Sequence, residues 1–230
     1  MNENTQSRTI PIHRYLEYTQ LTPTITYNDV DRMVQEAKEH AFVGLCLPPF
    51  WVKKAKRDLG DADVQLVTVV GFPLGYQMTE TKIGEMQQAI HDGADELDLV
   101  MNVSAFKSGM PWVKIEIAKC ASLAHQHLRL LKVIIETAYL TDEEVTRACK
   151  LCADAGADYV KTSTGFAGAG ATEHHIQLMR SVLPSNVGIK ASGGIKTAQQ
   201  AITLIKAGAD RIGASAALSI VREYNDLPEQ

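Results

Sequence analysis

A short signature occurs three times along the chain, and this internal repeat limits the possible folds more than any other feature. It reads Asp92-Gly93-Ala94-Asp95, Ala155-Gly156-Ala157-Asp158 and Ala207-Gly208-Ala209-Asp210. Each copy follows a helical pattern and precedes an apolar run, at a point where glycine can adopt the left-handed conformation that ends a helix. The three glycines lie 63 and 52 residues apart. Each interval holds two strand-plus-helix units of about 30 residues, the size of a βα repeat.

Eight apolar runs fit the strands of such units, at 14–20, 42–47, 65–71, 96–102, 129–136, 157–162, 187–191 and 210–214. Eight parallel strands alternating with helices predict one closed (β/α)8 TIM barrel, with residues 1–230 forming a single domain. A doubly wound open sheet is the alternative. No Gly-x-Gly-x-x-Gly follows the first run, which counts against the dinucleotide-binding form of that sheet.

Composition and charge argue against several classes of function. The 230 residues are 45% hydrophobic and carry a net charge of -4 without a sustained basic run, so we expect no nucleic-acid surface. No apolar stretch approaches the ~20 residues of a membrane helix. Residues 1–8 lack the apolar region of a signal peptide, and a cytoplasmic protein is expected. Cys149 and Cys152 lie within a helical pattern without a second pair, so we interpret them as small core residues rather than zinc ligands.

Polar residues follow one parity of several predicted strands. Glu96 and Asp98 alternate with apolar residues in one strand, and Lys132 and Glu136 do so in the next. Lys190 likewise lies opposite the apolar face of its strand. Because the apolar parity must pack against the surrounding helices, the polar parity is expected to point into the barrel. A buried structural network, such as Asp98 with Lys132, is the alternative to a catalytic role.

Two lysines favour a catalytic role over a purely structural one. Lys161 and Lys190 end adjacent parallel strands, about 4.8 Å apart by sheet spacing, at the barrel end where active sites lie. Like charges so close should push one amine toward its neutral form. A neutral lysine is a nucleophile for a carbonyl carbon, so the pair predicts an imine-forming site. The pattern does not choose between the two lysines.

Glycine-rich turns follow the last three predicted strands, at 164–170, 192–194 and 213–215. Barrels often bind phosphate there through loop amides. Together with the lysines, these turns indicate a phosphorylated aldehyde or ketone as the substrate. The histidines at 125, 127, 174 and 175 form no ligand set on strand ends, so we expect no metal.

Six motifs, in order along nearly the whole chain, carry a family resemblance: Gly71-Phe72-Pro73-Leu74-Gly75, Glu96-Leu97-Asp98-Leu99-Val100-Met101-Asn102, Leu131-Lys132-Val133-Ile134-Ile135-Glu136-Thr137, Val160-Lys161-Thr162-Ser163-Thr164-Gly165-Phe166, Lys190-Ala191-Ser192-Gly193-Gly194 and Arg211-Ile212-Gly213-Ala214-Ser215. On these motifs the chain resembles the deoxyribose-phosphate aldolases. This family of metal-independent class I aldolases cleaves 2-deoxy-D-ribose 5-phosphate reversibly into acetaldehyde and D-glyceraldehyde 3-phosphate, in deoxyribonucleoside catabolism.

The resemblance implies a role for each site residue. Lys161 would form the Schiff base and Lys190 would perturb it, while Asp98 and Lys132, with a water, would shuttle protons. Substrate and phosphate binding would fall to Thr164, Gly165, Gly193, Gly194 and Ser215. No cofactor is expected, and the family suggests a homodimer.

Three departures leave fine specificity open. Glu17 and Thr22 stand where family members commonly have Asp and Lys, and Ala216 replaces a second serine. Two alternatives remain at this point. One is another phosphosugar aldolase or transaldolase-like enzyme that uses the same lysine, and the other is a non-catalytic barrel that binds phosphorylated metabolites.

Overall fold

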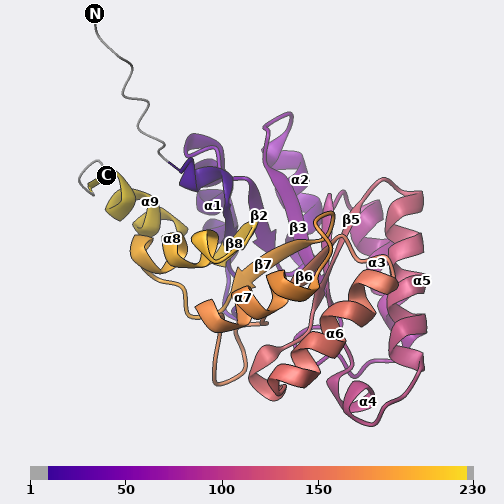
Figure 1. Ribbon diagram of the computed structural model, residues 1–230. Coiled ribbons are helices and arrows are strands. Elements are labelled where there is room, and N and C mark those ends of the chain that lie inside the picture. The colour runs from indigo at the N-terminus through magenta and orange to yellow at the C-terminus, as the bar shows by residue number, and fades with distance from the viewer. Residues whose placement is uncertain (1–9, 227–230) are drawn as a thin grey trace, which may run out of the picture.

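A computed structural model describes residues 10–226 and shows eight parallel strands closed into a barrel (Figure 1). The strands are β1 (Leu16–Thr19), β2 (Gly44–Leu47), β3 (Gln65–Val70), β4 (Glu96–Val100), β5 (Leu130–Ile134), β6 (Tyr159–Lys161), β7 (Gly188–Ser192) and β8 (Arg211–Ala214). They pair in chain order, and β8 closes on β1. The predicted (β/α)8 barrel is confirmed, and the open sheet is excluded.

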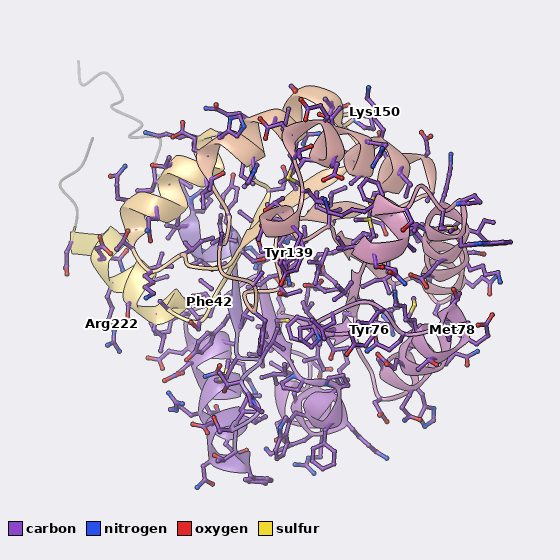
Figure 2. The ribbon with its side chains drawn as sticks, turned by 90° about the horizontal axis from the view of Figure 1, so that it is seen from below. Phe42, Tyr76, Met78, Tyr139, Lys150 and Arg222 are labelled. Carbon is purple, nitrogen blue, oxygen red and sulfur yellow. The ribbon has the colours of Figure 1, made fainter. Side chains whose placement is uncertain are left out.

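Helices follow the strands and form the outer layer. They are α1 (Tyr27–Glu39), α2 (Val52–Leu59), α3 (Thr79–His91), α4 (Val103–Lys107), α5 (Trp112–Gln126), α6 (Asp142–Asp154), α7 (Glu173–Val182), α8 (Ala198–Lys206) and α9 (Ala217–Asp226), with short 3-10 turns at Ile12–Arg14, Pro49–Trp51 and Thr137–Tyr139. The view from below looks onto the barrel end where the strands finish, with Tyr76 and Tyr139 in the segments after β3 and β5 (Figure 2).

The repeated signature ties neighbouring strands together. In each copy the aspartate precedes a strand and accepts a hydrogen bond from a backbone N–H of the strand before it. The pairs are Asp95 with Leu66 at 3.0 Å, Asp158 with Leu131 at 2.7 Å and Asp210 with Ile189 at 2.8 Å. The glycine of each copy has a positive φ, which lets the chain leave the helix and enter the strand. The repeat is therefore a clamp between adjacent strands.

Apolar residues form two separate clusters, of which the strand parity predicted the larger. The larger cluster lies between the strands and the helices and includes Leu97, Leu131 and Ile189. The smaller one consists of Cys46, Val67 and Val69, with Leu21 and Phe72 packed against it. The opposite parity of β4, β5 and β7 leaves charged side chains inside the barrel, and these form the site described below.

Some sequence predictions fall on the chain ends. The prediction of one domain over residues 1–230 extends past the described range at both ends, and the segment at residues 1–8 lies outside it. Within residues 10–226, no helix combines the length and the apolar character needed to cross a membrane.

Candidate active site

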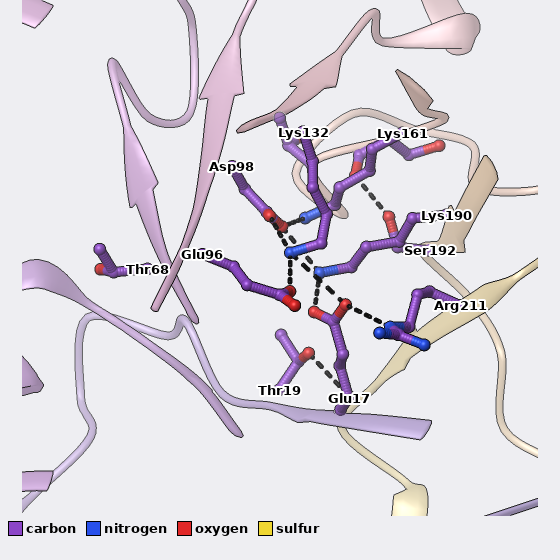
Figure 3. Close-up of polar contacts among 12 residues, drawn as sticks. Glu17, Thr19, Thr68, Glu96, Asp98, Lys132, Lys161, Lys190, Ser192 and Arg211 are labelled. Atoms are coloured by element: carbon purple, nitrogen blue, oxygen red, sulfur yellow. Dashed lines mark hydrogen bonds and ion pairs between the residues drawn. The ribbon is translucent and has the colours of Figure 1, made fainter. Parts of the chain in front are cut away.

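Six charged side chains meet inside the barrel (Figure 3). Three are lysines, from β5, β6 and β7: Lys132, Lys161 and Lys190. Three are carboxylates, from β1 and β4: Glu17, Glu96 and Asp98. All six are buried, with at most 2% of each residue exposed. Charges at this depth are tolerated only when they are paired, and here three ammonium groups face three carboxylates.

Asp98 is the hub of this cluster. Its Oδ2 accepts hydrogen bonds from Lys161 Nζ at 2.8 Å and from Lys190 Nζ at 2.7 Å, while Lys132 Nζ donates to Oδ1 at 3.1 Å. Burial by itself would raise the pKa of Asp98, but the three ammonium groups outweigh burial and hold that pKa well below its usual value. Asp98 is therefore an anion shared by three cations.

Lys190 and Lys132 are held in their charged forms. Burial opposes the charge on Lys190, but the carboxylates of Asp98 and Glu17 outweigh burial and raise its pKa above the usual value. The same balance, with Glu96 as a further partner, raises the pKa of Lys132 well above the usual value. The sequence argument, that two neighbouring lysines push one amine toward its neutral form, did not include these carboxylates. Because they stabilise the charge on Lys190, Lys190 is not the neutral amine of the pair.

Lys161 differs from the other two lysines in its surroundings. Register places it directly beside Lys190, as expected from the sequence. Of the three barrel lysines, only Lys161 lines a cleft of about 180 Å³ at the end of the barrel where the strands finish. A molecule in this cleft would meet Lys161 before either of its neighbours.

The same cleft is lined by all five residues predicted to bind substrate or phosphate: Thr164, Gly165, Gly193, Gly194 and Ser215. Gly193 and Gly194 are consecutive residues with positive φ, a backbone that other residues adopt only with strain. Their backbone therefore borders the cleft without side chains, which suits an anion bound by backbone N–H groups. The structure thus brings the lysine pair and the glycine turns to one place.

Several residues of the site received no role from the sequence. The strand parity placed Glu96 inside the barrel with Asp98, but Glu96 was not among the predicted site residues, and the structure pairs it with Lys132. Glu17 lies within the first predicted strand. Its contact with Lys190 becomes visible only once the barrel is closed. The exposed Lys196, two residues after the second glycine turn, also lines the cleft, and so does Thr22.

Comparison with known proteins gives a consistent result. The family model described as DeoC/LacD family aldolase matches residues 9–223. A protein of Brevibacillus brevis named deoxyribose-phosphate aldolase is 48% identical, over 91% of this chain and 95% of its own length. One of the same name from Thermococcus kodakarensis is 47% identical, over 94% of this chain and 97% of its own length. Among solved structures, the tetrameric deoxyribose phosphate aldolase of Aeropyrum pernix superimposes with a TM-score of 0.87 at 32% identity, over 95% of this chain and 94% of that one.

Proposed function

The chain belongs to the DeoC/LacD family of aldolases, and on that premise we propose that it cleaves 2-deoxy-D-ribose 5-phosphate reversibly into acetaldehyde and D-glyceraldehyde 3-phosphate. The observation that carries the proposal is the position of Lys161. Its amine lies in the cleft that the glycine turns border, and it donates to an aspartate that two further lysines also contact. A phosphosugar bound at the turns would therefore present its carbonyl to a buried lysine.

In the proposed reaction Lys161 acts as the nucleophile. Its neutral amine forms a bond to C1 of the open-chain aldehyde, and the resulting carbinolamine takes up one proton on its hydroxyl and loses water to give a protonated imine. Removal of the proton from the C3 hydroxyl then breaks the C2–C3 bond. The electron pair of that bond moves toward the imine nitrogen and gives an enamine, while glyceraldehyde 3-phosphate leaves. Protonation at C2 and addition of water release acetaldehyde and regenerate the amine.

Asp98, Lys132 and Lys190 have distinct roles in this proposal. Asp98 is an anion that contacts Lys161, so with Lys132 and a water it can relay protons between the nucleophile and the substrate. Lys190 remains a cation, because Glu17 and Asp98 stabilise its charge. This places a fixed positive charge directly beside Lys161, so Lys190 can act on the nucleophile as the resemblance implies.

We also propose a cytoplasmic setting in deoxyribonucleoside catabolism and a homo-oligomeric assembly. The resemblance suggested a dimer, whereas the Aeropyrum pernix relative is described as a tetramer. Light scattering coupled to size-exclusion chromatography would distinguish the two assemblies by mass.

The proposal is tested by turnover and by covalent trapping. We expect the protein to cleave deoxyribose 5-phosphate in the presence of EDTA, because the imine serves as the electron sink. Acetaldehyde with borohydride should add one ethyl group to Lys161, as mapped by peptide mass spectrometry, and Lys161→Met should remain unlabelled. Label on Lys190 with Lys161 untouched would reverse the two roles.

Each alternative predicts a different result in these assays. A transaldolase-like enzyme would prefer dihydroxyacetone to acetaldehyde as donor. A non-catalytic barrel would bind deoxyribose 5-phosphate without turnover and without label.

A further inference from the structure

Glu136 has an unusual backbone for a residue other than glycine. It follows the end of β5, with φ of 54° and ψ of 72°, in the left-handed region. Side chains other than glycine rarely adopt this conformation, and it persists where the surrounding structure fixes it. The left-handed turn ends the strand before Glu136, so this residue does not continue the alternation that places Lys132 among the barrel charges. No ion pair links Glu136 to a lysine or arginine in residues 10–226.

The carboxylate of Glu136 forms its hydrogen bonds with one residue, Thr164, which follows the neighbouring strand β6. Its Oε2 accepts a hydrogen bond from the backbone N–H of Thr164 at 3.1 Å and another from the Thr164 hydroxyl. That hydroxyl accepts in turn from the backbone N–H of Phe166 at 3.0 Å. Glu136 is buried, with 3% of the residue exposed, so water does not compete strongly for these bonds. The carboxylate therefore fixes the turn from Thr164 to Phe166.

This turn is one end of the loop that borders the cleft. Its other end is held separately: Ala171 N–H donates to Ser192 C=O at 3.0 Å, and Gly170 packs so closely that an added Cβ would lie 2.0 Å from the Gly193 carbonyl oxygen. Thr164 and Gly165 line the cleft, whereas Glu136 does not. Glu136 therefore acts on the cleft only through Thr164.

We propose that Glu136 is a positioning residue of the site that binds the substrate's phosphate group. It holds Thr164 and Gly165 in place beside the second glycine turn, at 192–194. The inference rests on the proposed function, because it takes this cleft as the phosphate subsite. It predicts that binding of the phosphate group depends on the length of the side chain at position 136 rather than on its charge. The carboxylate must extend far enough to accept both hydrogen bonds from Thr164.

Two substitutions separate reach from charge. Glu136→Asp keeps the charge and tolerates the left-handed backbone, but it is one methylene too short to reach Thr164. Glu136→Gln keeps the length and presents an amide oxygen that can accept both hydrogen bonds. The readout is kcat/KM for deoxyribose 5-phosphate divided by kcat/KM for 2-deoxyribose, which has no phosphate. The inhibition constant of inorganic phosphate against 2-deoxyribose cleavage is a second measure of the subsite.

We expect Glu136→Asp to lower this ratio about 10- to 100-fold, through a higher KM for the phosphorylated substrate, since each hydrogen bond lost to a charged acceptor is worth about tenfold. Phosphate inhibition should weaken by a similar factor. Glu136→Gln should stay within about threefold of wild type in both measures. Thr164→Val should resemble Glu136→Asp, and the double variant should be no worse than either single variant, because both remove the same contact. Glu143→Asp, at an exposed carboxylate of α6, is the matched control and should change neither measure.

The outcomes distinguish this inference from the proposed function. No turnover of deoxyribose 5-phosphate by the wild type would refute the proposed function itself. With an active wild type, an unchanged ratio in Glu136→Asp, or an equal loss with both substrates, would overturn the positioning role. A Glu136→Gln enzyme as impaired as Glu136→Asp would also overturn it, because the result would show that the negative charge of Glu136, and not the length of its side chain, is required. If Glu136→Asp does not fold, Glu136→Gln decides the question, since a ratio more than about threefold below the wild type would then refute the positioning role.

Discussion

Replacing Asp98 by asparagine removes one negative charge from the centre of the barrel while keeping the side chain's size. In the wild type three ammonium groups face three carboxylates, all of them buried. In Asp98→Asn, three ammonium groups would face two carboxylates. The cluster must then either keep an unpaired positive charge or release one proton.

Both routes cost free energy, and their magnitudes can be compared. Leaving a buried charge without its partner costs about 3–5 kcal/mol. An unpaired charge of this kind lowers the pKa of the ammonium that carries it. At pH 8, releasing the proton of a lysine with the unfolded-state pKa of ~10.4 costs about 3 kcal/mol. We therefore expect Asp98→Asn to be destabilised by about 3 kcal/mol at pH 8.

The two proteins should then differ in how their stability depends on pH. In the wild type the pKa values of Lys190 and Lys132 are raised, so their contribution is fully present below the unfolded pKa of ~10.4 and is lost as the pH rises through the higher folded pKa. In the variant one lysine pKa is lowered, so the unfolded state binds more protons and stability rises with pH. The slope is at most about 1.36 kcal/mol per pH unit, or about 2 kcal/mol between pH 8 and 9.5.

Urea unfolding of both proteins at several pH values measures this difference directly. Asp63→Asn, which removes an exposed carboxylate paired with Arg14, is the control and should cost no more than about 1 kcal/mol at any of these pH values. A loss below about 1 kcal/mol in Asp98→Asn, with the same pH dependence as the wild type, would refute the balance of buried charges.

Catalysis gives an independent check on the same variant. An amide cannot relay protons, so turnover should fall about 10²- to 10⁴-fold. Trapping of acetaldehyde by borohydride needs only a neutral amine and should persist. An Asp98→Asn enzyme that turns over at the wild-type rate would reduce Asp98 to a structural partner of the lysines.

Three further predictions follow from other parts of the barrel. Gly213→Ala would place a methyl group 3.1 Å from the Lys190 side chain, so we expect kcat to fall about tenfold with little change in KM, measured by steady-state kinetics. Asp158→Ala removes the acceptor for the Leu131 N–H and should cost about 1–3 kcal/mol in urea unfolding, with kcat unchanged. Cys46 is buried, and burial raises its pKa to about 11, so iodoacetamide at pH 7.5 should leave this thiol unlabelled in the native protein; labelling within minutes would contradict the packing of β2.

Much of the fold was predictable because it depends on local patterns. The three glycine signatures gave the size of the repeating unit, and all eight predicted strands overlap an observed one. Alternation along β4 and β5 placed Asp98 and Lys132 inside the barrel, where they contact each other. Period-2 alternation fixes which face a side chain occupies, and chain order fixes which strands are neighbours in a barrel.

The balance of charge was not predictable in the same way. Whether Lys190 is neutral or charged depends on which acids its ammonium reaches, and its contact with Glu17 spans 173 positions of the sequence. Closing β8 on β1 creates that contact, since β1 pairs with both β2 and β8. The left-handed turn at Glu136 was missed for a different reason. Its cause is the Thr164 contact at the end of another strand, and no local signal marks it.

Glu17 shows how one departure from the family pattern fits into the barrel. Its register partners are Gly44 on β2 and Gly213 on β8, so it has a glycine on each side. A Cβ at Gly44 would lie 3.2 Å from the Glu17 side chain, which means that the glycine leaves room for the longer acid. Glu17 then contacts Lys190 and lies 3.6 Å from Lys132, and it supplies one of the three negative charges. Glutamate in place of the aspartate common in the family therefore keeps a carboxylate in contact with the buried lysines.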